Sequence, residues 1–110
     1  MVKIDNYQKL QNLTGISKKA NNIYFGESLI KMIREERVFF VIIKKSASAN
    51  FFKMISQKCF HYNIPLYSVD ENIDLDKATG MFNVNALGFK KNQLSKKILE
   101  ILQEVGLYEQ

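Results

Sequence analysis

Cys59 and His61 are the residues that come nearest to catalytic chemistry, since a thiol beside an imidazole can act as a nucleophile. Each is the single residue of its type in the chain. They stand two positions apart in a segment with helical periodicity, and side chains at that spacing face different ways. The pattern favours a buried structural cysteine and a histidine on the helix surface, so we expect no enzyme activity, no catalytic residue and no cofactor.

Asp70, Glu71, Asp74 and Asp76 form an acidic segment that raises the question of a metal site. A calcium loop requires a glycine at its sixth position and a glutamate at its end, and this segment has neither. The single cysteine also excludes an all-cysteine zinc site. We therefore expect no metal, and we interpret the carboxylates as stabilising a short helix electrostatically.

The stretch FGES, residues 25–28, is the first of two candidate binding loops. It joins a short apolar run to an amphipathic helix, and the N–H groups and partial positive charge of a helix N-terminus suit a phosphate. Lys31 and Arg34 lie one and two turns into that helix, while Glu27 and Ser28 can hydrogen-bond base edges. The alternative is purely structural: the glycine turns the chain, Glu27 or Ser28 caps the helix, and the lysine is solvated.

The stretch GMFN, residues 80–83, is the second candidate loop and carries a methionine and an aromatic residue between a predicted helix and a predicted strand. Exposed apolar side chains in such a loop can stack on unpaired bases of RNA. In the alternative, Met81 and Phe82 fold back over the core. The chain has neither a GxxxxGK[ST] phosphate loop nor a GxGxxG motif after a predicted strand.

Helices and strands are expected to alternate along the chain. The run VFFVII, residues 38–43, is rich in β-branched and aromatic residues, which is typical of a strand buried on both faces by helices. Asp5, Ser48 and Gly80 are expected to cap helices. The pattern predicts an α/β fold, a three-layer α-β-α sandwich with a small mixed sheet of about four strands. The expected helices are 5–20, 27–36, a segment from Ser48 to Asn63, 73–79 and a segment from Asn92; the expected strands are 23–25, 38–43, 66–69 and 84–89.

The length and net charge of the chain limit the classes of protein to which it can belong. A chain of 110 residues favours a single domain over 1–110. It has 16 Lys and Arg against 11 Asp and Glu, a formal net charge of +5, which fits a nucleic-acid partner. One cysteine fits a reducing cytoplasm, and no apolar run approaches the roughly 18 residues of a membrane span. We expect a cytoplasmic monomer that does not associate with membranes.

In the order and spacing of its motifs, the chain resembles the L-seven-Ae / L-thirty-e superfamily of ribosomal proteins, and within it the bacterial YlxQ-type branch. LTGISKKANNIYFGE is similar to LLGLARRAGKLVSGE of that branch. IREERVFFVIIKKSASANFFKMISQKCFHYNIPLY follows its IR-x4-KLVLLAxDAS-x-N-x-KK-x3-KC-x-YY-x-VP pattern. LDKATGMFNVNALGFKKNQLSKKIL is similar to its LGxAxG loop, last strand and DxxFAKKI-type helix. The resemblance covers roughly residues 10–102.

The resemblance implies a small RNA-binding protein of translation that recognises ribosomal or kink-turn-containing RNA. The family's first contact element corresponds to Gly26, Glu27, Ser28 and Lys31, and it contacts sheared G·A pairs and nearby phosphates. Its second element corresponds to the loop 80–83, that is Gly80, Met81, Phe82 and Asn83, and packs against a flipped-out base.

The turn of this chain departs from the family in two ways. The spacing from Gly26 to Lys31 is one residue shorter, so either a residue is deleted near Ser28 or Phe25 occupies the glycine position. Tyr24 and Phe25 also stand where relatives often carry a basic residue.

Three functions remain open: a kink-turn RNA-binding protein, a protein-interaction module of the same fold that has lost RNA binding, and a small enzyme that uses Cys59 and His61. The first predicts that four basic side chains gather on one face beside both loops, namely Lys18, Lys19, Lys31 and Arg34.

Overall fold

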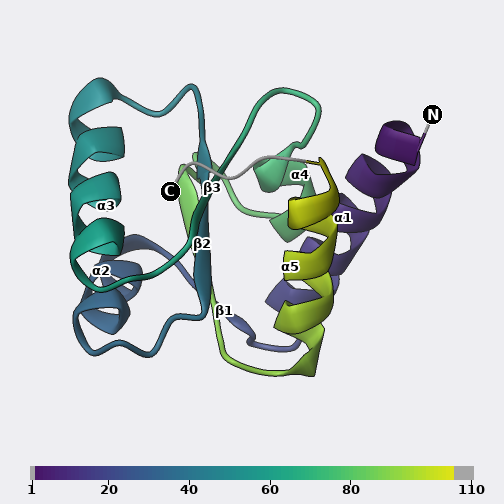
Figure 1. Cartoon of the computed structure of the whole chain (residues 1–110). Helices are drawn as coiled ribbons and strands as arrows, with labels where there is room; N and C mark the ends of the chain where they lie inside the picture. The colour runs from purple at the N-terminus through teal and green to yellow at the C-terminus, as the bar shows by residue number, and fades with distance from the viewer. Residues whose placement is uncertain (1, 106–110) are drawn as a thin grey trace.

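The computed structural model describes the backbone of residues 2–105 and the side chains of residues 6–104. Helices and strands alternate along this part of the chain, as the sequence predicts (Figure 1). The elements are α1 (Val2–Lys19), β1 (Ile23–Tyr24), α2 (Gly26–Arg34), β2 (Phe40–Lys44), α3 (Ala49–His61), β3 (Leu66–Val69), α4 (Leu75–Thr79), β4 (Ala86–Phe89) and α5 (Gln93–Val105).

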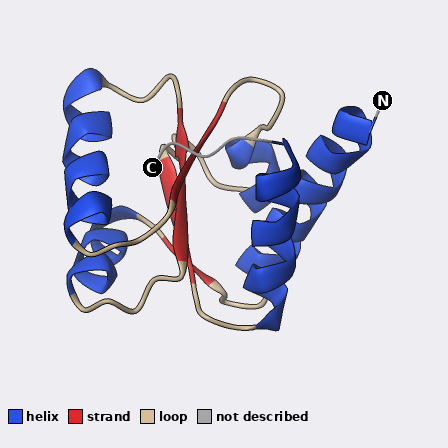
Figure 2. Cartoon of the chain, viewed as in Figure 1, coloured by secondary structure: helices blue, strands red, loops and turns tan. Residues whose placement is uncertain are grey.

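The four strands form one mixed sheet in the order β1-β4-β2-β3. β2 pairs with β3 in parallel, and β4 pairs antiparallel with both β2 and β1. Helices α2 and α3 lie on one side of the sheet, and α1, α4 and α5 lie on the other (Figure 2). The predicted three-layer α-β-α sandwich is therefore confirmed.

β2 shows why the apolar run in the sequence was informative. Its residues alternate between two hydrophobic clusters, with Phe40 and Ile42 on the side of α1, α4 and α5 and Val41 and Ile43 on the side of α2 and α3. All four are fully buried. Phe40 also stacks on Phe89 of β4 with ring centroids 4.6 Å apart. A strand covered by helices on both faces needs apolar side chains at every position.

Two of the three predicted caps are confirmed. The Ser48 hydroxyl accepts a hydrogen bond from the Phe51 amide at 3.2 Å, and Gly80 ends α4 in the left-handed conformation with φ 74°. The prediction for Asp5 is wrong, because α1 begins at Val2 and Asp5 lies inside the helix. The predicted bounds of β3 are confirmed without a shift, and those of the other elements shift by up to three residues; β2, for example, begins at Phe40 rather than at position 38.

Helix α4 begins at Leu75, two residues later than predicted, because Asp74 is its N-cap. The Asp74 carboxylate accepts a hydrogen bond from the Lys77 amide at 3.0 Å. In the part of the chain that the structure describes, no helix is long and apolar enough to cross a membrane.

Candidate nucleic-acid interface

The two predicted loops come to the same end of the sheet. β1 runs antiparallel to β4, with Ile23 opposite Phe89 and Tyr24 opposite Gly88. The chain therefore leaves β1 toward Gly26 at the end where it enters β4 from the loop 80–83. The pairing register thus joins two segments more than 50 positions apart into one candidate surface.

The N-terminus of α2 carries no side-chain cap. Its N-cap is Phe25, in an extended conformation with φ −149° and ψ 166°, and no side chain accepts a hydrogen bond there. The interpretation in which Glu27 or Ser28 caps the helix is wrong, and both side chains are exposed. Since the first amides of a helix have no acceptor within it, the N–H groups of residues 26–28 are available to a ligand.

Gly26 itself begins the helix with φ +60°, a conformation that favours glycine. A Cβ there would meet nothing within 4 Å, so the requirement for glycine is conformational and not steric. The turn at the first loop therefore depends on Gly26, in agreement with the prediction that this glycine turns the chain.

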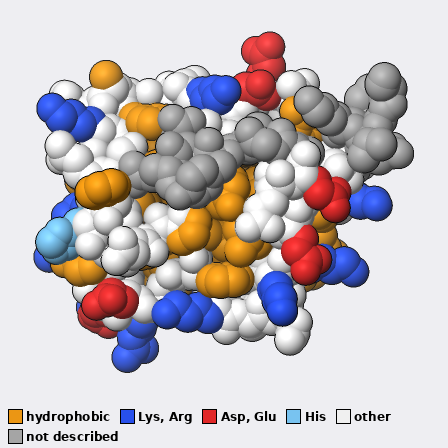
Figure 3. Space-filling model, in the orientation of Figure 1, with side chains coloured by type: hydrophobic (Ala, Val, Ile, Leu, Met, Phe, Trp, Pro, Cys, Tyr) orange, Lys and Arg blue, Asp and Glu red, His pale blue; other side chains and the backbone are white. Residues whose placement is uncertain are grey.

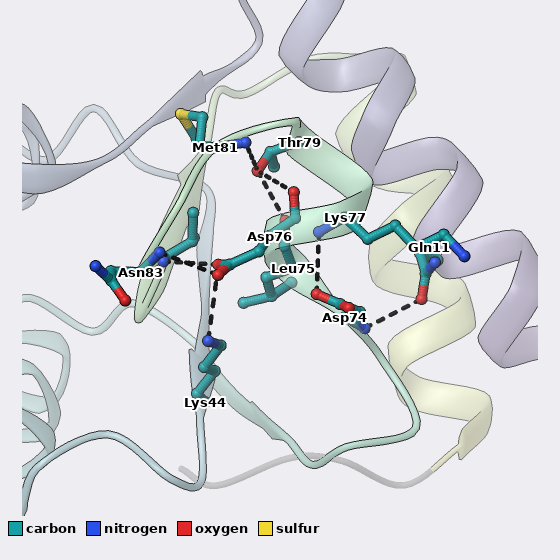
Figure 4. A network of polar contacts seen from close by, with 10 residues as sticks. Gln11, Lys44, Asp74, Leu75, Asp76, Lys77, Thr79, Met81 and Asn83 are labelled. Carbon is teal, nitrogen blue, oxygen red and sulfur yellow. Dashed lines mark hydrogen bonds and ion pairs between the residues drawn. The ribbon is translucent and has the colours of Figure 1, made fainter.

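The second loop is held in place by Asp76 of α4 (Figure 4). One carboxylate oxygen accepts from the Val84 amide at 2.8 Å, and the other accepts from the Asn83 amide at 3.0 Å. The Lys44 ammonium lies 3.7 Å from the same carboxylate. At the start of the loop, the Met81 amide donates to the Thr79 hydroxyl at 3.3 Å.

These contacts also set the charge state of Asp76. The hydrogen bond from the Val84 amide, with further contributions from the Asn83 amide and the Lys44 ammonium, lowers the pKa of the Asp76 carboxyl below its ordinary 3.8, although partial desolvation opposes this. Asp76 is therefore ionised at neutral pH and acts as the anchor of the loop. The predicted stabilisation of a short helix by the acidic segment fits Asp74, the N-cap of α4. Asp76 instead binds the amides of Asn83 and Val84, a role that the sequence did not reveal.

Met81 and Phe82 behave differently, and the alternative in which both side chains fold back over the core is right for Met81 and wrong for Phe82. Met81 packs against the hydrophobic cluster on the side of α1, α4 and α5. Phe82 is 90% exposed. Because Met81, Asn83 and Val84 are hydrogen-bonded through their amides, the Phe82 ring projects into solvent from a fixed backbone.

The four basic residues divide between two layers. Lys18 and Lys19 end α1 on one side of the sheet, and Lys31 and Arg34 belong to α2 on the other. On the face shown in Figure 3, Lys and Arg side chains are spread around the rim with Asp and Glu among them. The structure therefore places Lys31 and Arg34 on the helix of the first loop, and it does not gather all four around it.

Lys19 lies at the other end of β1. The turn after it is tied to the start of α5, since the Asn22 side-chain amide donates to the Ser95 hydroxyl at 3.0 Å and the Asn22 carbonyl accepts from the Lys90 amide. β1 therefore separates Lys19 from Gly26.

Lys90 is a basic residue at the edge strand that the sequence analysis missed. Its ammonium lies 5.3 Å from the centre of the Tyr24 ring, a cation–π distance. No sequence motif marks this pair, because the two residues meet only through the pairing of β1 with β4. A lysine directly after the last strand was the one available signal.

Cys59 and His61 do not form a reactive pair. Cys59 is fully buried, and burial raises the pKa of its thiol to about 12. His61 is exposed, and its ring meets Tyr62 edge-on at 4.7 Å. Among residues 6–104, no three His, Cys, Asp or Glu side chains lie together in a way that could hold a metal ion.

Cys59 is expected to react slowly with iodoacetamide in the folded protein at pH 8, because a thiol with a pKa near 12 holds almost no thiolate and is shielded by the core. The rate of alkylation, followed by mass spectrometry, should rise sharply in denaturing urea. Rapid alkylation of the native protein would contradict this placement and return the Cys–His enzyme to consideration.

No family model matches the chain. Two curated relatives do match, both named RNA-binding protein YlxQ. The Enterococcus faecium protein is 28% identical over 99 residues, which cover 89% of this chain and 95% of that protein. The Bacillus subtilis (strain 168) protein is 33% identical over 69 residues, which cover 62% of this chain and 69% of that protein.

Solved structures share the fold. A Bacillus halodurans protein of unknown function superposes with a TM-score of 0.78 at 26% identity, over 86% of this chain and 97% of its own. The 15.5kD RNA binding protein of Giardia lamblia superposes with a TM-score of 0.70 at 18% identity, over 93% of this chain and 88% of its own. On its similarity to the curated relatives, the Bacillus subtilis protein above all, the chain belongs to the YlxQ family, a branch of the L-seven-Ae / L-thirty-e superfamily.

Proposed function

We propose that the chain is a non-enzymatic RNA-binding protein, a single domain over residues 1–110 that recognises kink-turn or similar structured RNA. Its two YlxQ relatives are named RNA-binding proteins, which supports RNA as the partner. The net charge of +5 is consistent with a polyanionic ligand. We further propose that the protein works in the cytoplasm as a monomer and associates with the ribosome.

The observation that carries this proposal is the exposure of the Phe82 ring on a loop whose backbone is held by hydrogen bonds. A phenylalanine that is 90% exposed gives up the free energy of burial, which is unusual for a residue of this type. Its backbone is nevertheless fixed on both sides by hydrogen bonds to α4. An exposed aromatic ring on an ordered loop is a ready platform for an unstacked base, and base–aromatic stacking contributes about 1–3 kcal/mol.

The mechanism is geometric. The uncapped N-terminus of α2 binds one strand through the amides of residues 26–28, with Lys31 against the phosphates and Glu27 and Ser28 at base edges. Phe82 stacks on a base expelled from the duplex. Because both contacts require the kinked form, binding stabilises it over the extended form by differential affinity.

The other predicted residues have supporting roles. Gly26 and Gly80 provide the left-handed turns of the two loops. Met81 secures the second loop to the core, and Asn83 anchors it at Asp76. Arg34 and Lys19 extend the attraction for more distant phosphates from the two sides of the sheet.

A fluorescence-anisotropy titration with a kink-turn duplex and an unkinked duplex, at two salt concentrations, tests the proposal. We expect a clear preference for the kink-turn. Lys31→Ala should weaken binding and reduce the salt slope by about one, since one phosphate contact is lost. Lys53→Ala, which removes an exposed lysine of α3, is the matched control and should leave the preference intact.

Equal, weak binding to both duplexes would contradict kink-turn recognition. Absence of binding at low salt would contradict RNA binding and favour the protein-interaction module. One feature of the surface supports that second candidate: Phe60 of α3 is 75% exposed, and it lines a shallow depression together with Ser56, Gln57 and His61. Such an apolar side chain on an outer helix is suited to a protein partner.

A further inference from the structure

We propose that the RNA presents two unpaired bases to this protein, one stacked on Phe82 and a second stacked on Phe25. This inference rests on the proposed RNA binding and specifies the class of RNA. It starts from Phe25, which is 46% exposed although it follows directly on a strand of the sheet.

The direction of the Phe25 side chain follows from the alternation of residues along an extended chain. Ile23 belongs to the hydrophobic cluster on the side of α1, α4 and α5, and Tyr24 packs on the other side, against the cluster beneath α2 and α3. Phe25 continues the extended conformation. Its ring therefore leaves the sheet on the same side as Ile23.

The second loop lies on this side as well. Met81 packs against the same cluster as Ile23. The antiparallel pairing of β1 with β4 brings Phe25 to the end of the sheet at which the loop 80–83 enters β4. The exposed rings of Phe25 and Phe82 thus belong to one end of the sheet. Met81, the neighbour of Phe82 in the chain, packs on the side to which the Phe25 ring points.

Tyr24 is not available for the same task. The Lys90 ammonium sits 5.3 Å from the centre of its ring, and the residue packs against the core cluster beneath α2 and α3. Of the two aromatic residues at the end of β1, only Phe25 offers its ring to a ligand.

The RNA backbone next to a base on Phe25 also has a binding partner. Phe25 is the N-cap of α2, so the uncapped amides of residues 26–28 begin directly beside its ring. A phosphate at these amides would be adjacent to a base on Phe25. The geometry therefore fits a bulge with at least two unpaired nucleotides. A duplex with one flipped-out base would use only one of the two exposed rings.

The test uses a kink-turn duplex with a three-nucleotide bulge, in which 2-aminopurine replaces each bulged base in turn. Stacking on an aromatic ring changes the fluorescence of this base analogue. With the unmodified protein we expect a change at two bulge positions. Phe82→Ala should abolish one of them and Phe25→Ala the other, and Phe25→Ala should weaken binding by about 5- to 150-fold.

Phe25→Leu keeps an apolar side chain at the N-cap and removes the aromatic face, so it should lose the same signal with an unchanged melting temperature. Phe60→Ala, an equally drastic truncation of an exposed ring on α3, should change neither signal. If both Phe25 variants bind as tightly as the unmodified protein and leave every signal unchanged, the second stacking site is refuted while RNA binding stands. If the unmodified protein does not prefer the kinked duplex, the proposed function fails first and this inference fails with it.

Discussion

Phe82→Ala is expected to weaken binding to a kink-turn duplex by about 5- to 150-fold and to change the free energy of unfolding by less than about 0.5 kcal/mol. The ring is 90% exposed, so its removal exposes little buried surface and opens no cavity. What is lost is the stacking platform for the unstacked base. Anisotropy titrations and urea denaturation of the same preparation measure the two effects separately.

Two further variants sharpen this prediction. Phe82→Tyr keeps an aromatic face and should restore most of the affinity, since stacking tolerates any flat aromatic ring. Phe60→Ala removes another exposed phenylalanine and should leave RNA affinity unchanged. A stability loss with Phe82→Ala as large as that from a buried residue would show that the ring packs against the protein, contrary to its exposure.

Parts of the fold could be predicted because local sequence and tertiary environment agree. The apolar run 38–43 indicates a buried strand, and β2 is buried at each of its first four positions. Gly80 marks a left-handed helix end, which few other residues adopt easily. In such places the physical requirement acts on a short segment, so a short segment is enough to reveal it.

The composition of the site could not be predicted in the same way, because it depends on contacts between distant segments. The sequence predicts Phe25 as the last residue of a strand. The exposure of its side chain to solvent follows only from its place at the edge of the sheet. The contact between Lys90 and Tyr24 arises from the pairing of β1 with β4, which no local pattern specifies. The positions of the two connecting turns were predicted correctly, since glycines and apolar loop residues are local signals. That the two loops bind RNA stays a prediction.

Asp76 shows the same limit within a single segment. In the sequence it is one of several acidic residues near a short helix, and helix electrostatics account for it. In the structure its carboxylate binds two amides that lie seven and eight positions further along the chain, together with a lysine from β2. A carboxylate that organises a loop cannot be told from one that caps a helix until the path of the loop is known.

Asp76→Asn is expected to loosen the second loop and to reduce affinity for kinked RNA on the order of tenfold. The asparagine amide has one acceptor oxygen, whereas the carboxylate uses one oxygen for the Val84 amide and the other for the Asn83 amide. The attraction to Lys44 is also lost. Hydrogen exchange at the Asn83 and Val84 amides measures the loosening, and anisotropy measures the affinity.

Glu71→Gln is the matched control for the change in charge. It neutralises an exposed carboxylate in the same acidic segment as Asp76. Glu71 itself lies outside the loop 80–83. Removal of a negative charge alone should strengthen attraction to RNA slightly. A fall in affinity with Asp76→Asn and no fall with Glu71→Gln would therefore identify the anchoring of Phe82 as the cause, and equal behaviour of the two variants would contradict it.

The pH dependence of stability gives an independent check on Asp76. Its pKa is lowered in the folded protein, chiefly by the hydrogen bond from the Val84 amide, so the ionised form stabilises the fold at pH values above the ordinary 3.8. This contribution is lost as the pH falls through the lowered pKa, because protonation of the folded state then removes it. The stability difference between the unmodified protein and Asp76→Asn, measured by urea denaturation, should be largest near neutral pH and should shrink in acid. A difference that stays constant between pH 7 and pH 3 would mean that the carboxylate does not hold the loop through its charge.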